Sequence, residues 1–188
     1  MKFAVLGNSG SGKSTLAHWV ARAIDARVLD LDSVVWEPRK IAALRPQEAA
    51  LEDVAAFCES RNSWVVEGCY ANMIEATFRF DPTLIFLKAP VEQCIENCRS
   101  RPWEPHKYTS KEEQDQRLAF LLDWVADYYS RDGVMSLRGH QDAFDRYAGV
   151  KFEISERLSF DPASPVLAEI VEPKSLQIPN PQSRIPSV

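Results

Sequence analysis

A run of nine small and polar residues near the start of the chain, GNSGSGKST, has the composition of a phosphate-binding site. It follows the pattern Gly-x-x-x-x-Gly-Lys-Ser, in which the glycines let the backbone curl and turn its N–H groups inward. In this pattern Lys13 reaches the β- and γ-phosphates of a nucleotide, and the Ser14 hydroxyl is a ligand for Mg²⁺. A Gly/Ser linker is the alternative, but a strand-like apolar run precedes the segment and a helical pattern follows it. We therefore predict that Mg·ATP binds to Gly7, Asn8, Ser9, Gly10, Ser11, Gly12, Lys13, Ser14 and Thr15.

Two acids follow the second apolar run, RVLDLDSVVW. Because side chains alternate along a strand, we expect Asp30 and Asp32 to project the same way from the sheet. They would lie at the carboxyl end of a parallel strand, beside the phosphate loop, where open α/β sheets bind ligands. We assign Asp30 to Mg²⁺, through water, and Asp32 to the acceptor, whose hydroxyl it would orient or deprotonate. The alternatives are a pair of solvated acids or a helix cap.

A third acid ends the next apolar run, WVVEG. Glu67 is the expected carboxylate partner of the magnesium ion, and a surface glutamate at a strand end is the alternative. The next residue, Gly68, would permit the close approach of a ligand because it has no side chain.

Arginines are the candidates for stabilising the transferred charge. Arg99 and Arg101 come just before a segment broken by prolines, RSRPWEPHKY. If Pro102 to Tyr108 is a mobile lid, its closure would carry the guanidinium groups onto the phosphates and expel water. Arg79 is a second candidate, for an anionic acceptor. For each arginine a surface salt bridge is the alternative interpretation.

Two tryptophans lie close to these segments, Trp36 after the acidic pair and Trp103 in the predicted lid. Each could stack on a ring of the substrate or pack in the core, and both interpretations stay open. We expect no metal site or catalytic triad from the three histidines, which form no cluster: His18, His106 and His140. We expect four reduced thiols, since no pair has Cys-x-x-Cys spacing, at Cys58, Cys69, Cys94 and Cys98.

Apolar runs alternate with helical patterns along the chain, which predicts a parallel sheet covered by helices on both faces. A proline opens two of the predicted helices, at Pro46 and Pro90, and a Ser-x-x-Glu capping box opens a long one at Ser110. A shorter helix near residue 141 would end with Gly149 as its cap. The five predicted strands are residues 3–6, 27–31, 64–66, 83–87 and 150–154.

Composition excludes some classes of protein. The 188 residues suffice for one domain with a sizeable core, and 45% hydrophobic with 26% charged residues is ordinary for a globular protein. No apolar run reaches the length of a membrane span and no signal peptide is evident, so we expect a cytoplasmic protein without a membrane partner. The net charge of −5 disfavours direct binding of nucleic acid.

The last thirty residues differ in character from the rest. Six of the twelve prolines fall after Ser159, so this tail cannot form regular helix for long. We predict a kinase-like domain at 1–158, with the lid at about 99–110, and a Pro-rich extension at 159–188. The extension is either loosely held or an arm that packs through Val166 to Val171.

Four motifs together are similar to the bacterial DNA topology modulation proteins, small phosphate-loop proteins related to adenylate kinase and shikimate kinase. The resemblance rests on GNSGSGKST, LDLDSVVW, WVVEGCY and TLIFLKAP, the last leading to an Arg-containing lid, and covers about residues 1–155. It implies an α/β fold of the P-loop NTPase type. This is a three-layer αβα arrangement with a parallel five-stranded sheet and a short lid, like the nucleoside monophosphate kinases.

The resemblance also implies Mg·ATP binding and phosphoryl transfer. Glu67 stands where most such proteins have aspartate, and the lid has fewer arginines than in many nucleotide kinases. The Asp30-x-Asp32 pair is similar to the arrangement in shikimate kinase, so a hydroxyl-bearing metabolite is favoured over a nucleotide as acceptor. We therefore expect an ATP-dependent small-molecule kinase. The alternatives are a nucleotide-dependent regulatory ATPase that acts on DNA topology or a protein partner, and a protein that only binds nucleotide.

Overall fold

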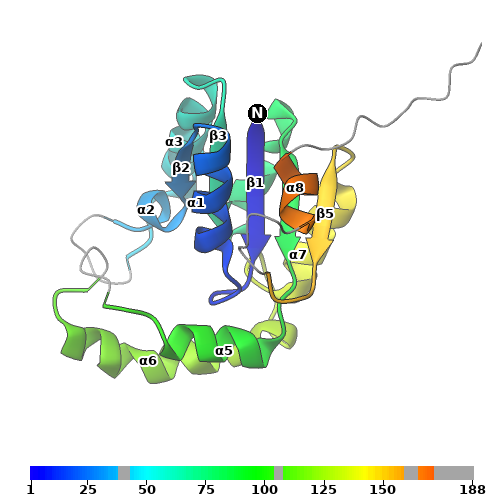
Figure 1. Cartoon of the computed structure of the whole chain (residues 1–188). Coiled ribbons are helices and arrows are strands. Elements are labelled where there is room, and N and C mark those ends of the chain that lie inside the picture. Colours follow the sequence, from blue (N-terminus) through cyan, green and yellow to red (C-terminus); the bar gives the residue numbers. More distant parts are fainter. Residues whose placement is uncertain (38–42, 104–107, 159–164, 172–188) are drawn as a thin grey trace, which may run out of the picture. The chain divides into compact units, whose positions relative to one another are not determined.

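The computed structural model divides the chain into two compact units, Met1–Leu158 and Ser159–Val188 (Figure 1). The residues that the structure describes are 1–37, 43–103, 108–158 and 165–171. In the second unit the described residues form one helix of seven residues, α8 (Pro165–Val171). This described helix begins at a proline and ends two residues before Pro173, in agreement with the limit that proline sets on helix length.

The first unit is built on a five-stranded, all-parallel sheet in the order β2-β3-β1-β4-β5. This confirms the predicted fold class. The central strand β1 is hydrogen-bonded to a neighbour on each edge, and residues 3–6 are buried on both faces because helices cover both sides of the sheet. The strands are β1 (Lys2–Gly7), β2 (Arg27–Asp30), β3 (Trp64–Gly68), β4 (Thr83–Leu87) and β5 (Lys151–Ile154).

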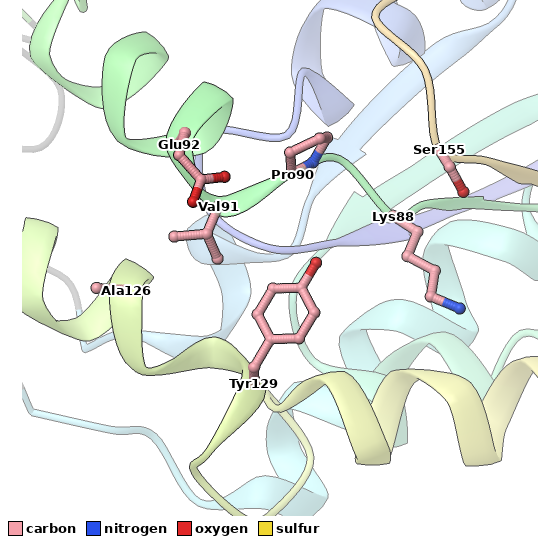
Figure 2. A pocket seen from close by; sticks show the side chains of 7 residues that line it. All are labelled: Lys88, Pro90, Val91, Glu92, Ala126, Tyr129 and Ser155. Carbon is pink, nitrogen blue, oxygen red and sulfur yellow. The ribbon is translucent and has the colours of Figure 1, made fainter.

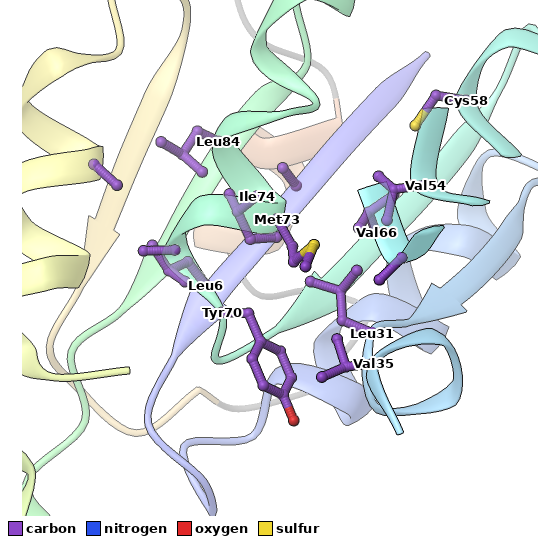
Figure 3. Close-up of a cluster of buried hydrophobic side chains, with 14 of the residues drawn as sticks. Leu6, Leu31, Val35, Val54, Cys58, Val66, Tyr70, Met73, Ile74 and Leu84 are labelled. Carbon is purple, nitrogen blue, oxygen red and sulfur yellow. The ribbon is translucent and has the colours of Figure 1, made fainter. Parts of the chain in front are cut away.

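Helices pack on both faces of this sheet. Helix α1 (Lys13–Ala23) packs on β2 and β3 from one side, with Leu16 and Val20 fully buried. Figure 3 shows part of the core on the other face, where strand residues such as Leu6 and Val66 meet helix residues such as Val54. The remaining helices of this unit are α2 (Asp32–Val35), α3 (Gln47–Glu59), α4 (Ala71–Glu75), α5 (Val91–Arg99), α6 (Lys111–Ala126) and α7 (Leu137–Arg146), with 3₁₀ turns at Phe78–Phe80 and Asp127–Tyr129.

The predicted helix starts agree with the structure. Helix α3 begins directly after Pro46 and α5 directly after Pro90. At the start of α6 the Ser110 hydroxyl accepts a hydrogen bond from the Glu113 N–H, as in a capping box. The Glu113 carboxylate reaches back to Thr109 instead of Ser110, at 2.9 Å from its backbone nitrogen.

One predicted helix end is wrong. Helix α7 ends at Arg146, and its cap is Tyr147 in an extended conformation. Gly149 is not among the described residues with a positive φ, so it is not a left-handed cap. A Cβ atom added to Gly149 would lie 2.4 Å from the Tyr147 hydroxyl oxygen. The glycine is needed here because the tyrosine ring packs against its backbone.

A buried histidine joins α7 to the loop after β3. His140 is fully buried, its Nε2 lies 2.8 Å from the Cys69 carbonyl oxygen, and its Nδ1 lies 2.7 Å from the Tyr128 hydroxyl. Because a carbonyl oxygen only accepts, Nε2 carries the proton and Nδ1 accepts from Tyr128. Burial lowers the pKa of His140 from 6.5 to about 4, so the ring is neutral at pH 7.

We expect this histidine to make stability fall in mild acid. Its pKa is lower in the folded than in the unfolded chain, so the unfolded chain binds more protons between about pH 6.5 and pH 4. The free energy of unfolding should therefore fall across that window, by about 3 kcal/mol from this group. Urea unfolding of the wild type and of His140→Gln at pH 7, 6 and 5 measures this. An equal pH dependence in both proteins would contradict the assignment, and His18→Gln, at an exposed position, is the control.

Candidate active site at the phosphate loop

The loop between β1 and α1 has the backbone of a phosphate-binding site. Gly10 has a φ of 79° and Gly12 a φ of 95°, both in the left-handed region that favours glycine. The loop closes on itself through Asn8, whose backbone oxygen accepts from the Ser11 N–H at 3.2 Å. The Ser11 hydroxyl is buried and has no hydrogen-bond partner among the described residues. A buried polar atom of this kind fits a site that is completed by a ligand.

Lys13, the first residue of α1, folds back over the loop. Its ammonium group donates to the Asn8 backbone oxygen at 2.9 Å, and the residue is only 8% exposed. An almost buried ammonium group at the start of a helix raises the positive potential of the loop. This potential favours an anion such as a phosphate.

Helix α5 packs against the loop at Gly10. A Cβ atom at Gly10 would lie 2.2 Å from the Cys94 carbonyl oxygen and 2.9 Å from the Cys98 sulfur. The Asn97 side chain donates to the Gly10 backbone oxygen at 2.8 Å. The sequence analysis did not identify Asn97, because it lies 87 residues from Gly10 in the chain and forms no motif with it.

The three predicted acids lie near one another at the carboxyl ends of β2 and β3. Asp30 is paired with Glu67 in the register of these strands, and Glu67 is only 3% exposed. Burial raises the pKa of Glu67; Lys13 and the Ser14 hydroxyl lower it, while the Asp30 and Asp32 carboxylates raise it further. These interactions bring the acids together with the loop residues that the motif assigns to phosphate and metal.

The predicted position of Asp32 on the strand is wrong. Strand β2 ends at Asp30, and Asp32 is the first residue of helix α2. The physical reason is local, since the Asp30 carboxylate accepts a hydrogen bond from the Asp32 N–H at 2.9 Å and turns the chain out of the extended conformation. Asp30 thus forms a side-chain turn with the residue two positions later and is not a helix cap, since the N-cap residue of α2 is Leu31. The Asp32 carboxylate in turn accepts a hydrogen bond from the Tyr70 hydroxyl at 2.7 Å.

Replacing Glu67 by a neutral residue should raise the stability of the ligand-free protein and weaken its metal-dependent nucleotide binding. In Glu67→Gln the ligand-free protein should melt at a higher temperature at pH 7, because a buried carboxylate with a raised pKa destabilises the folded state at high pH. The same change should weaken Mg²⁺-dependent nucleotide binding by roughly 10- to 100-fold. Thermal unfolding with and without Mg·ADP reports both effects. Glu59→Gln is the control, because Glu59 is exposed in an ion pair with Arg79; an unchanged response to Mg·ADP in Glu67→Gln would contradict the assignment.

Of the two predicted lid arginines, the structure brings Arg101 to the loop. Its guanidinium donates to the Ser9 hydroxyl at 3.0 Å. Arg99 is the last residue of α5 and its side chain is exposed. Residues 104–107 of the predicted lid lie outside the described residues, so closure of the lid over the phosphates stays a prediction.

A third arginine, Arg131, was missed by the sequence analysis. Its guanidinium lies 3.5 Å from the Asn8 side-chain oxygen and 3.5 Å above the Trp124 ring. It also donates to the backbone oxygens of Trp124 and Met135, and burial lowers its pKa. All its hydrogen-bond acceptors among the described residues are therefore neutral oxygens. A partly buried cation with neutral partners beside the phosphate loop is suited to bind an anion.

Arg79 is not brought to this site. It forms an exposed ion pair with Glu59 at 2.8 Å, and its guanidinium lies over the ring of Phe80. The Phe80 backbone oxygen accepts from Lys2, the first residue of β1, so Arg79 lies at the amino end of the sheet. The surface salt bridge is thus the interpretation that the structure supports.

Gly68 and Trp36 have structural partners. A Cβ atom at Gly68 would lie 2.8 Å from the Leu31 side chain, so this glycine allows close packing between two strand ends rather than the approach of a ligand. The Trp36 indole donates to the Tyr70 hydroxyl at 3.1 Å, and the residue is 36% exposed. Trp103 is 47% exposed, which argues against core packing for it.

A separate hollow of about 550 Å³ lies at the carboxyl ends of β4 and β5 (Figure 2). Its lining contains no residue of the phosphate loop, but it includes the first turn of α5, the helix that supports Gly10. The residues around it are Lys88, Pro90, Val91, Glu92, Ala126, Tyr129 and Ser155.

Two absences hold for the described residues. In the parts of the chain that the structure describes, no group of three or more histidine, cysteine, aspartate or glutamate side chains could hold a metal ion. Within the same ranges, no helix has the length and apolar character needed to cross a bilayer.

Comparison with known proteins identifies the fold. No protein-family model matches the chain. A sugar kinase from Janibacter sp. HTCC2649 superposes with a TM-score of 0.51 at 15% identity, covering 92% of this chain and 90% of that one. A gluconokinase from Sinorhizobium meliloti 1021 superposes with a TM-score of 0.50 at 18% identity, covering 91% and 87%. The fold is that of the small P-loop kinases. At these identities the likeness concerns the fold alone.

One characterised enzyme is similar in sequence to a short part of the chain. Over 57 residues the chain is 37% identical to a tRNA dimethylallyltransferase from Sulfurimonas denitrificans, which is 30% of this chain. The match spans only 19% of the length of that enzyme. These comparisons do not support the expected relation to the DNA topology modulation proteins.

Proposed function

We propose that the chain is a Mg·ATP-dependent kinase that transfers the γ-phosphoryl group of ATP to a small acceptor, preferentially a hydroxyl-bearing metabolite. The observation that carries this proposal is the position of the Glu67 carboxylate, which is only 3% exposed and lies between β1 and Asp30 of β2 at the strand ends from which the phosphate loop starts. A loop that only bound nucleotide would have no need of the further carboxylates of Asp30 and Asp32 at the same edge of the sheet.

The residues present fit Mg·ATP. The Ser11 hydroxyl is buried without a described partner, and a Cβ atom at Gly12 would have open space around it. The Ser14 hydroxyl and the Asp30 and Glu67 carboxylates are oxygen donors of the kind that Mg²⁺ prefers. When bound, Mg·ATP supplies the phosphoryl group and part of the charge neutralisation.

Each group of residues has a role in this reaction. The loop N–H groups and Lys13 hold the phosphates, while Arg101 and Arg131 stabilise the charge that develops during transfer. Asp32 orients the acceptor hydroxyl and takes its proton as the new oxygen–phosphorus bond forms. The β–γ phosphoanhydride bond breaks in the same step, and ADP leaves.

The test is ADP release from Mg·ATP by the full-length protein across a panel of acceptors. The panel holds sugars, sugar acids, cyclic alcohols, nucleosides and nucleoside monophosphates, with Lys13→Ala as the blank. Stimulation by an alcohol supports the proposal, and stimulation by a nucleoside monophosphate would transfer it to a nucleotide kinase. ATP binding without stimulation by any acceptor would contradict it. The nucleotide-dependent regulator of DNA or of a protein partner would then be preferred, and duplex DNA binding at low and high salt would test it.

A further inference from the structure

The side chain of Asn8 joins the phosphate loop to a distant part of the chain, and the residue is only 1% exposed. Its amide nitrogen lies 3.1 Å from the backbone oxygen of Val125, in the last turn of α6. Its amide oxygen lies 2.9 Å from the Ser9 nitrogen and 3.5 Å from the Arg131 guanidinium. One side chain thus connects the loop to the end of a helix that lies 117 positions later.

The orientation of this amide follows from the chemistry of its neighbours. The backbone oxygen of Val125 only accepts hydrogen bonds, while the Ser9 N–H and the Arg131 guanidinium only donate them. The amide nitrogen of Asn8 must therefore face α6, and the amide oxygen must face the loop and the arginine. Rotation of the side chain would leave buried polar groups without partners, which is costly.

Arg131 joins the same two parts of the molecule. Its guanidinium donates to the backbone oxygen of Trp124, in the last turn of α6, and to that of Met135 at 2.9 Å. It also lies 3.5 Å from the centroid of the Trp124 ring. A cation at this place is attracted by the negative end of the helix. We call Asn8, Trp124, Val125 and Arg131 the loop–helix junction.

The backbone of Asn8 belongs to the phosphate site itself. Its oxygen accepts hydrogen bonds from the Lys13 ammonium at 2.9 Å and from the Ser11 N–H at 3.2 Å. A phosphate group in the loop would attract the ammonium more strongly than a neutral carbonyl oxygen does, because both partners are then charged. The hydrogen bonds of the Asn8 backbone then differ between the ligand-free and the occupied loop, while its side chain remains attached to α6.

The end of α6 also contacts the loop indirectly, through α5. The two helices pack against each other (Figure 1), and Val125 is buried in one apolar cluster with Cys94 and Cys98 of α5. The same face of α5 lies against Gly10. Closely packed contacts of this kind transmit small displacements, so a change in the loop reaches both helices.

We propose that Asn8 is a positioning residue whose side chain couples occupancy of the phosphate loop by a nucleotide to the last turn of α6. The coupling is reciprocal, so attachment to α6 also raises the affinity of the loop for the nucleotide. The inference rests on the proposed function, because it takes the loop as the nucleotide site, but it needs no acceptor.

The first test follows Trp124 with Mg·ADP as the ligand. In the full-length protein labelled with 5-fluorotryptophan, fluorine-19 NMR resolves the tryptophans, and the Trp124 signal is assigned by its absence in Trp124→Phe. Saturating Mg·ADP should move this signal, because the ring lies against the Arg131 guanidinium of the junction. The Trp64 signal is the reference, since Trp64 is fully buried and begins β3 at the opposite end of the sheet. An unmoved Trp124 signal at saturation would overturn the inference.

The second test removes the side chain of Asn8. In Asn8→Ala the Kd for Mg·ADP, measured by calorimetry, should rise by roughly 10-fold, because the loop loses its hydrogen bonds to the junction. At saturating Mg·ADP the displacement of the Trp124 signal should fall to less than about half of the wild-type value. A weaker Kd with the full displacement would show a merely structural role and would overturn the inference.

The matched control is Gln141→Ala, and a second variant guards against misfolding. Gln141 is an amide residue of α7 whose side chain bonds to Lys88 and Asp145, away from the loop, so its removal should change neither value. If Asn8→Ala does not fold, Asn8→Ser takes its place, because the serine side chain is too short to reach the Val125 oxygen. The same loss of displacement is expected, and a full displacement would count against the coupling.

These outcomes separate the inference from the proposed function. If Mg·ADP binds and the Trp124 signal moves, but no acceptor stimulates turnover, only the kinase proposal fails. If an acceptor stimulates turnover while the Trp124 signal stays in place, only the coupling fails. If Mg·ADP does not bind to the wild type at all, both fail.

Discussion

Lys13→Ala is expected to abolish ATP-dependent turnover, by roughly 10³-fold or more, while the protein stays folded. In the proposed reaction the Lys13 ammonium group contacts the transferred phosphates, and Lys13 is the first residue of α1, at the positive end of that helix. In the ligand-free structure its hydrogen bond goes to the Asn8 backbone oxygen. Its removal also takes away the positive charge that lowers the pKa of the buried Glu67, so we expect some loss of stability but not loss of the fold.

The measurement is ADP release under saturating Mg·ATP, together with circular dichroism to verify the fold. Lys111→Ala is the control, since Lys111 forms an exposed i,i+4 ion pair with Asp115 on α6 and changes the net charge equally. Turnover at the wild-type rate in Lys13→Ala would exclude the loop as the site of chemistry. The ATPase activity would then have to be assigned to a contaminant or to another part of the chain.

Gly10→Ala is expected to have the second large effect, on both stability and nucleotide binding. The φ of 79° is strained for alanine, and the new Cβ atom would lie 2.2 Å from the Cys94 carbonyl oxygen. This neighbour is backbone in the middle of α5, so the helix itself must move. Strain and overpacking together should cost roughly 3 kcal/mol or more, and the displaced loop should lose its nucleotide.

Gly12→Ala is the matched control for the clash. Gly12 has a similar positive φ, of 95°, but an added Cβ atom would meet nothing within 4 Å. Only the backbone strain remains, which costs about 1–2 kcal/mol. Urea unfolding of both variants measures the difference. Equal losses of stability would show that contact with α5 contributes nothing to the shape of the loop.

Much of the framework was predictable because its signals are local. A buried parallel strand is a short apolar run, and all five strands were predicted from such runs. The phosphate loop is contiguous in sequence, so the order of its residues alone predicted the curled conformation of its backbone. The run WVVEG also placed Glu67 at a strand end, where the structure shows it buried.

Other parts of the site could not be predicted because they depend on contacts between distant residues. Arg131 and Asn8 are 123 residues apart, and nothing in the sequence around Arg131 marks it. The alternation argument failed at Asp32 because the Asp30 carboxylate accepts a hydrogen bond from the Asp32 N–H, which ends the strand one residue earlier than predicted. Arg79 was assigned from its charge, but its position was determined by where a short 3₁₀ turn meets the amino end of the sheet.

Because α5 packs against Gly10, the conformation of the loop depends on residues of this helix as well as on the motif itself. The Cys94 carbonyl group leaves room only for a glycine at position 10, and the Asn97 side-chain amide donates a hydrogen bond to the Gly10 backbone oxygen. In an evolving lineage the inner face of α5 and the loop would have to change together. Grafting GNSGSGKST alone into another sheet would transfer the sequence without its backbone conformation. Grafting it together with α5 would transfer both.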